Sequence, residues 1–265
     1  MEGRKIILKK NTDKKFKTEN IGERLRKIKV NLTENILDII CPKTCPVCDK
    51  ILSSHENICT ACHSKLVYIH EPKCKKCGKE LRDETKEYCT DCSVNKHFFK
   101  CNVAVFEYSH MVSRSLYKFK YHNRRTYAKF YGEAMAKHCA YDIEMWNPDV
   151  IIPVPIHYKK RIKRGYNQAA LIARELGART NILVDEKYLY RVVNTKPMKE
   201  LNKTTRKKNV EKAFKIYKNV VKYNKIILVD DIYTTGSTLD ACAKALLAAG
   251  VKEIYCICMS VGYGI

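Results

Sequence analysis

Residues 226–238 read Ile-Ile-Leu-Val-Asp-Asp-Ile-Tyr-Thr-Thr-Gly-Ser-Thr, and this stretch decides the fold. Its four apolar residues, 226–229, are typical of a buried parallel strand. Two adjacent carboxylates, Asp230 and Asp231, follow the strand. A short loop of hydroxyls and one glycine comes next, made of Thr234, Thr235, Gly236, Ser237 and Thr238. After it, residues 239–249 predict an Ala/Leu-rich helix that Gly250 closes.

The chemistry of this stretch suits a phosphorylated sugar. Free backbone N–H groups at a helix start hold a phosphate, aided by the helix dipole. Thr and Ser hydroxyls can donate to the same phosphate oxygens, and carboxylates can accept from vicinal ribose hydroxyls. A strand that ends in an Asx turn and a Ser/Thr helix cap is the structural alternative. That alternative accounts for one Asp and one Thr but not for the whole string.

The string resembles the phosphoribosyl-pyrophosphate (PRPP) loop of type I phosphoribosyltransferases, in the order apolar run, Asp-Asp, two spacer residues and Thr-Thr-Gly-Ser-Thr. The resemblance implies that Asp230 and Asp231 form the catalytic pair and bind the ribose 2′ and 3′ hydroxyls. It implies that residues 234–238 bind the 5′-phosphate and that Mg²⁺ binds together with PRPP. The carboxylates would orient the sugar and would not need to act as general bases.

Composition points to an anionic partner. The chain has 265 residues, with 51 Lys and Arg against 28 Asp and Glu, which gives a net charge of +23. Nucleic acid and phosphorylated metabolites lead the candidate partners of so basic a protein; the alternative is a generally Lys-rich composition with solvated lysines. The N-terminus lacks the apolar region of a signal peptide, and no window is long and apolar enough to span a membrane. We therefore expect a cytoplasmic protein with reduced cysteines.

Eight of the 14 cysteines form four Cys-x-x-Cys knuckles, namely Cys45/Cys48, Cys59/Cys62, Cys74/Cys77 and Cys89/Cys92. Two such knuckles supply the four thiolates of a tetrahedral zinc site, which leaves no open position for catalysis. The simplest prediction is two sequential zinc ribbons with two structural Zn²⁺ ions. Pairing of the first knuckle with the third, and occupation of one site alone, stay open. A disulfide scaffold, a redox pair and an iron–sulfur cluster are the alternatives.

The rest of the chain predicts an α/β fold. Strands are expected at 103–106, 149–154 and 253–261, and an extended segment at 183–193. Helices are expected at 113–121, 126–140 and 167–176. Because strands and helices alternate, we expect a parallel sheet flanked by helices, whose ligands bind at the carboxyl ends of the strands. We expect a basic extension over 1–35, a double zinc ribbon over 36–97 and a phosphoribosyltransferase-like domain over 98–265. Residues 1–20 are expected to be disordered, and residues 21–40 predict a weakly amphipathic helix.

Two basic segments lie near the predicted site. The rigid Pro153-Val154-Pro155 step leaves one strand and precedes a basic loop whose Lys159, Lys160, Arg161 and Arg164 suit a pyrophosphate or another polyanion. A solvated charged face is the alternative for this run. Residues 194–225 form a long basic loop with eleven Lys or Arg and two Glu, which predicts a lid or a polyanion contact.

Several segments carry a second, narrower resemblance: Tyr117-Lys118-Phe119-Lys120, Pro153-Val154-Pro155, Arg161 with Arg164-Gly165-Tyr166-Asn167-Gln168, Thr195-Lys196-Pro197, and Arg206 through Phe214. They stand in the order seen in the ComF family of competence-associated, phosphoribosyltransferase-like proteins. That family also carries an N-terminal double zinc ribbon after a helix and a Cys-Pro step, like Ile40-Cys41-Pro42 here. The resemblance covers residues 36–265. Tyr166 stands where Phe is common, and lysines replace several arginines.

The ComF resemblance implies a part in DNA uptake during natural transformation, with binding of single-stranded DNA and a helicase as partner. Two functions stay open. The first is an enzyme that transfers a phosphoribosyl group from PRPP to an acceptor. The second is a DNA-binding uptake factor whose PRPP site is regulatory or vestigial. The intact Asp-Asp and Thr-Thr-Gly-Ser-Thr string favours PRPP binding, whereas the charge of +23 and the knuckles favour nucleic acid.

Overall fold

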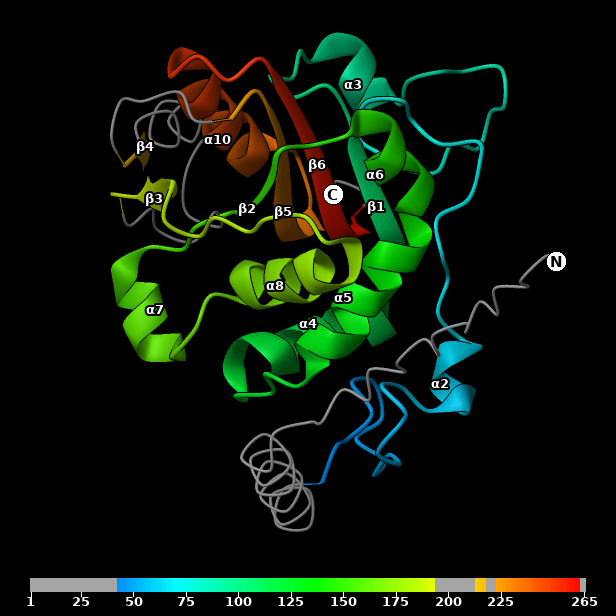
Figure 1. Cartoon of the computed structure of the whole chain (residues 1–265). Helices are drawn as coiled ribbons and strands as arrows, with labels where there is room; N and C mark the ends of the chain where they lie inside the picture. Colours follow the sequence, from blue (N-terminus) through cyan, green and yellow to red (C-terminus); the bar gives the residue numbers. More distant parts are fainter. Residues whose placement is uncertain (1–41, 194–212, 218–222, 263–265) are drawn as a thin grey trace, which may run out of the picture. The chain divides into compact units, whose positions relative to one another are not determined.

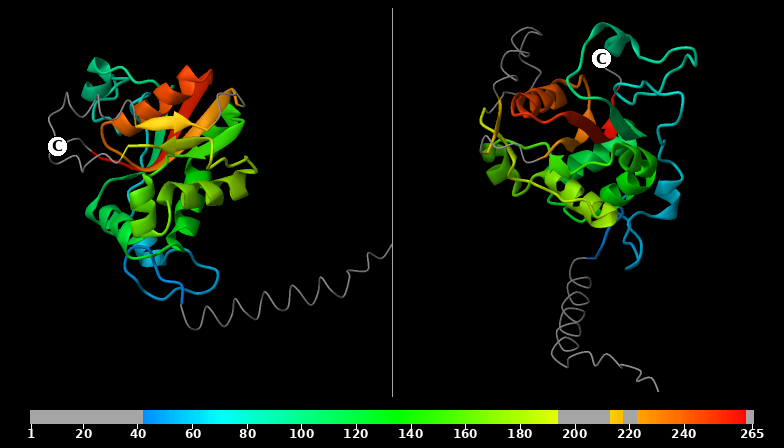
Figure 2. Two further views of the ribbon diagram at one scale, coloured as in Figure 1. Left: turned by 90° about the vertical axis from the view of Figure 1, so that its left-hand side faces the viewer. Right: turned by 45° about the horizontal axis from the view of Figure 1, so that its top comes forward.

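The computed structural model describes residues 42–193, 213–217 and 223–262. Within these ranges a four-stranded sheet has the order β1-β6-β5-β2 (Figure 1), and every pairing in it is parallel. Its strands are β1 (Asn102–Glu107), β2 (Val150–Pro153), β5 (Lys225–Tyr233) and β6 (Glu253–Val261). A separate antiparallel pair, β3 (Leu189–Arg191) and β4 (Phe214–Ile216), lies beside α10 (Ser237–Ala248) (Figure 2). The predicted parallel α/β sheet is confirmed.

Helices cover both faces of this sheet. One face carries α4 (His110–Tyr121), α5 (Tyr127–His138) and α8 (Gln168–Thr180), and α10 lies on the other (Figure 1). The shorter helices are α2 (Thr60–His63), α3 (Thr90–Val94), α6 (Ala140–Trp146) and α7 (Tyr158–Arg164). The described residues from Lys43 onward belong to one compact unit.

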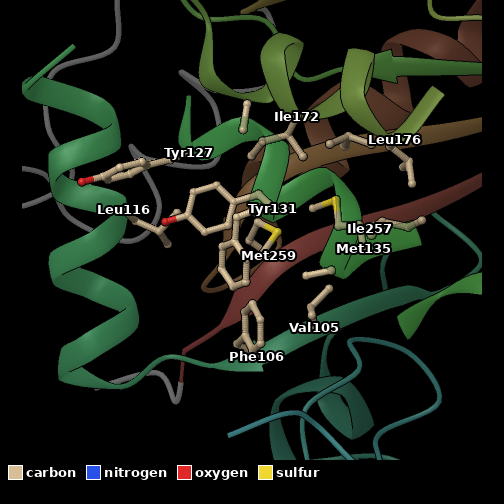
Figure 3. Packing of buried hydrophobic residues seen from close by; sticks show 14 of the residues in the cluster. Val105, Phe106, Leu116, Tyr127, Tyr131, Met135, Ile172, Leu176, Ile257 and Met259 are labelled. Carbon is tan, nitrogen blue, oxygen red and sulfur yellow. The ribbon is translucent and has the colours of Figure 1, made fainter. Parts of the chain in front are cut away.

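The sequence of β5 explains why both faces are covered. Ile227 and Val229 pack in one hydrophobic cluster with α5 and α8, whereas Ile226 and Leu228 pack in a second cluster with α10. All four side chains are fully buried, because alternate residues of a strand point to opposite faces. Figure 3 shows the first cluster, where Tyr131 and Met135 of α5 meet Met259 of β6.

Three boundaries differ from the sequence predictions. Strand β5 does not end before the carboxylates; it continues through Asp230 and Asp231 to Tyr233, because β6 pairs with it along that length. The segment after Pro153-Val154-Pro155, predicted as a loop, is the helix α7. The His157 side chain caps its start, and Gly165, with φ of 81°, ends it. The helix predicted over 126–140 ends at residue 138, and α6 follows it.

Other predictions are confirmed in part or fall outside the described ranges. Only residues 189–191 of the expected extended segment 183–193 form a strand, although Val184 makes a parallel bridge to Ile151 of β2. The segment 1–20, the helix 21–40 and most of the loop 194–225 lie outside the described residues. The domain boundaries expected at residues 35 and 97 stay predictions. In the described part of the chain, no helix has the length and apolar character that crossing a membrane requires.

Truncation of Leu176 should destabilise the fold. This α8 side chain is 0% exposed, and removal of a buried leucine side chain leaves a cavity that costs about 2–5 kcal/mol. Leu183→Ala is the matched control, because Leu183 is 56% exposed and surface truncations cost within about 0.5 kcal/mol. Denaturant unfolding of both variants measures the difference. Equal free energies of unfolding would contradict the core described above.

Candidate phosphosugar site and metal centres

The acidic pair lies at the carboxyl end of β5, where a parallel sheet places its ligands. Asp231 is only 8% exposed. Its Oδ2 lies 2.9 Å from Nζ of Lys120 on α4 and accepts a hydrogen bond of 3.1 Å from Nε2 of Gln168 on α8. The backbone N–H of Asp231 donates to Oδ1 of Asp230 at 2.8 Å. Two helices and one strand therefore hold the pair rigidly.

The two carboxyl groups differ in their electrostatic surroundings. Burial, together with the adjacent Asp231 charge, raises the pKa of the Asp230 carboxyl from its ordinary value of 3.8 to about 7. Burial by itself would lower the pKa of Lys120. The charge and the hydrogen bond of the Asp231 carboxylate together have the larger effect, so the pKa of Lys120 is raised. With a pKa of about 7, the Asp230 carboxyl can lose its proton when a cation or a hydrogen-bond donor binds next to it.

A short loop then leads into α10. Thr234 and Thr235 are exposed, and the Thr235 and Ser237 hydroxyl oxygens lie 2.8 Å apart. Gly236 is the N-cap of α10 with φ of 73°, and no side chain caps the helix. Backbone N–H groups of the first turn of an uncapped helix are available to an anion. The loop predicted from the sequence therefore has the backbone geometry of an anion site.

The basic residues predicted for pyrophosphate divide into two pairs on α7. Lys160 and Arg164 are partly buried, and Lys159 and Arg161 are exposed. Burial, and then the charges of Arg191, Arg164 and Lys120, lower the pKa of Lys160. The structure therefore places Lys160 near Arg191, Arg164 and Lys120, whereas Lys159 and Arg161 are exposed.

Sequence reasoning missed three polar groups of this site. Lys120 and Gln168 stood inside the segments that resemble the ComF family, but that resemblance gave them no role. Arg191 of β3 lies close enough to Asp230 for each charge to shift the pKa of the other. No local pattern marks Arg191, because only the folded chain brings β3 to the end of β5.

A cavity of about 570 Å³ lies beside α4, next to the acidic pair. Lys120 and Ile232, the residue after Asp231, line it together with three tyrosines, Tyr108, Tyr117 and Tyr121. Tyr117 and Tyr121 are 56% and 58% exposed, and their ring centroids lie 4.9 Å apart. The guanidinium of Arg164 lies 5.1 Å from the Tyr121 ring centroid. We call this surface the tyrosine groove.

The cysteine knuckles assemble into two clusters in the sequential order. Cys45, Cys48, Cys59 and Cys62 form the first, Cys74, Cys77, Cys89 and Cys92 form the second, and all four Sγ atoms of each cluster lie within 4.8 Å of one another. The Cys48–Cys59 and Cys77–Cys89 Sγ distances are 3.7 and 3.6 Å. A tetrahedron with Zn–S bonds of about 2.3 Å has edges of about 3.8 Å, so both clusters fit a structural zinc ion. None of the cysteines in the described ranges forms a disulfide bond.

The two clusters are anchored in different layers. Cys45, Cys59 and Cys62 pack in the hydrophobic cluster of α4, α5 and α8, whereas Cys74 and Cys77 pack in that of α10. Asp49 follows the first knuckle with φ of 64°. It pairs with Lys118 of α4 and accepts a hydrogen bond of 3.0 Å from the Tyr127 hydroxyl of α5. Each ribbon therefore uses the core of the sheet in place of a core of its own.

Two known families match this chain, one over the cysteine clusters and one over most of the parallel sheet. The family described as "Double zinc ribbon domain" matches residues 36–93, and "Phosphoribosyl transferase domain" matches residues 131–260. Among solved structures, a purine phosphoribosyltransferase from Pyrococcus horikoshii is similar at 18% identity and a TM-score of 0.33, covering 50% of this chain and 73% of that one.

Several curated proteins are similar over most of the chain. Competence protein F of Haemophilus influenzae is 30% identical, over 74% of this chain and 87% of the relative. Competence protein ComFC of Bacillus subtilis is 29% identical, over 76% and 82%. DNA utilization protein YhgH of Escherichia coli K12 is 26% identical, over 82% and 97%. With its double zinc ribbon and its phosphoribosyltransferase-type sheet, this chain belongs to the ComF family of competence-associated proteins.

Proposed function

We propose that the protein binds PRPP or a similar phosphosugar at the end of β5 and acts in DNA uptake. The buried Asp231 carboxylate, held by Lys120 and Gln168 beside an uncapped helix start, is the observation that supports phosphosugar binding. A carboxylate this well buried is costly unless a ligand or a fixed structure uses it. The names of the relatives, competence proteins and DNA utilization proteins, support the cellular role.

Each part of the ligand has a matching part of the site. Asp230 and Asp231 would accept from the ribose 2′ and 3′ hydroxyls. The 5′-phosphate would lie on the first turn of α10, contacted by Thr234, Thr235, Ser237 and Thr238 and by the backbone at Gly236. The pyrophosphate would lie toward Lys160 and Arg164. Bound Mg²⁺ would supply charge neutralisation to the pyrophosphate.

Phosphoribosyl transfer is the enzymatic form of this proposal. A nucleophile would form a bond to ribose C1 while the C1–O bond to pyrophosphate breaks, and the bonding electrons would leave with pyrophosphate. The cations on α7 and β3 would stabilise that departing negative charge. The acceptor would approach C1 from the open side of the site, where the tyrosine groove lies.

The tyrosine groove also supports binding of single-stranded DNA. Exposed aromatic rings let bases stack, and nearby cations attract the phosphate backbone. Arg114, Lys120 and His110 line the groove with the tyrosines, and the chain carries a net charge of +23. We propose that the protein works in the cytoplasm with single-stranded DNA and a helicase of the uptake machinery.

Calorimetry tests phosphosugar binding directly. PRPP with Mg²⁺ should bind the wild type and bind Asp231→Asn at least about tenfold more weakly, since a hydrogen bond to a charged group contributes about 1.5–3 kcal/mol. Thr235→Val, at an exposed loop position, should weaken binding without disturbing the core. Glu144→Gln removes an exposed carboxylate of α6 and is the control. No heat with the wild type would end the phosphosugar proposal.

Stability against pH tests the environment of Asp230. Its pKa is about 7 in the folded chain and 3.8 ordinarily, so between these values the folded state binds the extra proton. The free energy of unfolding contributed by this group therefore falls as pH rises through this window, and the loss is complete above pH 7. Asp230→Asn should raise the Tm relative to wild type at pH 8, and by less at pH 5.5.

Asp149→Asn is the control of opposite sign for this measurement. Backbone N–H groups of Lys225 and Asn224 donate to the Asp149 carboxylate and lower its pKa. This group therefore stabilises the fold above its unfolded pKa, and its loss should lower the Tm at pH 8. An Asp230→Asn variant less stable than wild type at pH 8 would contradict the raised pKa.

DNA binding is tested on the tyrosine groove. Tyr117→Ala with Tyr121→Ala should weaken binding of a fluorescent oligothymidylate by about tenfold or more, since stacking contributes about 1–3 kcal/mol per base. Tyr141→Ala is the control, because Tyr141 is also exposed, at 73%, but lies on α6 and outside the groove. The logarithm of the binding constant should also fall linearly with the logarithm of the salt concentration. Equal binding by both variants would place the DNA elsewhere.

A further inference from the structure

His97 lies between the second cysteine cluster and the loop of residues 234–238 that leads into α10. We call these residues the phosphate loop. Its Nδ1 donates to Oδ2 of Asp240 at 2.9 Å, because a carboxylate oxygen accepts. Its Nε2 lies 3.6 Å from Sγ of Cys92 and 3.4 Å from Oη of Tyr233. The His97 side chain is 5% exposed. One buried imidazole therefore contacts a metal-ligating thiol, the last residue of β5 and the first turn of α10.

The phosphate loop rests directly on this imidazole. A Cβ atom at Gly236 would lie 3.0 Å from Cε1 of His97 and 2.6 Å from Oη of Tyr233. Asp240 accepts a second hydrogen bond, of 2.9 Å, from the backbone N–H of Phe98. Gly236 of the loop and Asp240 of α10 therefore both contact the segment that follows the second cluster.

Ring contacts fix the orientation of His97. Its ring stacks on Phe99 with centroids 5.0 Å apart and meets the Tyr233 ring edge-on at 6.3 Å. Phe99 is buried in the same hydrophobic cluster as Cys74 and Cys77. The first cysteine cluster is attached differently, through Asp49 to α4 and α5.

We propose that His97 couples zinc binding by Cys74, Cys77, Cys89 and Cys92 to the conformation of loop residues 234–240. With the second cluster loaded, the zinc-bound Cys92 sulfur has a fixed position and packs against the edge of the imidazole, 3.6 Å from Nε2. The ring so positioned holds Asp240 through its Nδ1–H and forms the floor under Gly236. Affinity for the phosphosugar, which rests on the function proposed above, then depends on the second zinc and not on the first. His97 is a positioning residue, since it lies beneath the loop.

The experiment compares three variants of the full-length, zinc-loaded chain. Cys92→Ser disables the second cluster, and Cys48→Ser is the matched control in the first. His97→Ala leaves all eight cysteines in place and removes only the coupling group. Each protein is measured for zinc per chain, for amide hydrogen exchange across residues 232–262, and for PRPP affinity with Mg²⁺.

The coupling predicts a distinct pattern across these readouts. His97→Ala should keep two zinc ions per chain, speed exchange in residues 234–240 without speeding it in β6, and weaken PRPP binding by about 10- to 100-fold. Cys92→Ser should have one zinc ion and the same exchange pattern, and Cys48→Ser should have one zinc ion and a protected loop. A general loss of structure would speed exchange in β6 as well.

Failure of the coupling and failure of the proposed function are separable. A wild type that binds no PRPP would end the phosphosugar proposal, while the exchange data would still test the coupling without ligand. If His97→Ala keeps wild-type exchange in residues 234–240, the coupling is wrong. It is equally wrong if Cys48→Ser and Cys92→Ser expose the loop to the same extent.

Discussion

The buried Asp231 carboxylate is the constraint on which this structure depends. A charge removed from water at the end of β5 is costly unless charged and hydrogen-bonding partners surround it. Lys120 supplies the charge and Gln168 the hydrogen bond, and they come from α4 and α8, which pack in one hydrophobic cluster on the same face of the sheet. The contacts that pack these helices therefore also deliver the polar groups of the site. A change in the packing of α4 or α8 would therefore also move the groups that hold Asp231.

The cysteine ribbons belong to this same arrangement. Two lysines of α4, Lys118 and Lys120, face in different directions: the first pairs with Asp49 of the first ribbon and the second with Asp231. On the opposite face, His97 joins the second ribbon to the start of α10. Each ribbon is too short to bury a core of its own and shares that of the layer it contacts. One ribbon therefore packs into the hydrophobic layer on each face of the sheet.

Prediction from sequence succeeded where the signal is local. The apolar run of β5, the acidic pair, the glycine turn and the helix α10 follow one another in a single stretch, and the knuckle spacing predicted the eight clustered cysteines. It failed for α7, where a loop was predicted because only the charges of the residues after Pro155 were considered. The helix cap at His157 and the glycine that ends the helix, Gly165, were overlooked. It also missed the role of Arg191, whose approach to Asp230 depends on the chain path between β3 and β5. The tyrosines of the groove come from α4 and the end of β1, so no single segment displays them together.

By itself the sequence determined the class of fold and the eight cysteines that form the two clusters, because strand periodicity and the Cys-x-x-Cys turn are each set within a few residues. Only the tertiary structure decided which cations lie near the acidic pair, which cysteines share a cluster and that His97 lies beside Gly236 and the start of α10. These relations join residues far apart in the chain, and only packing of helices and ribbons against the two faces of one sheet brings such residues within hydrogen-bonding distance.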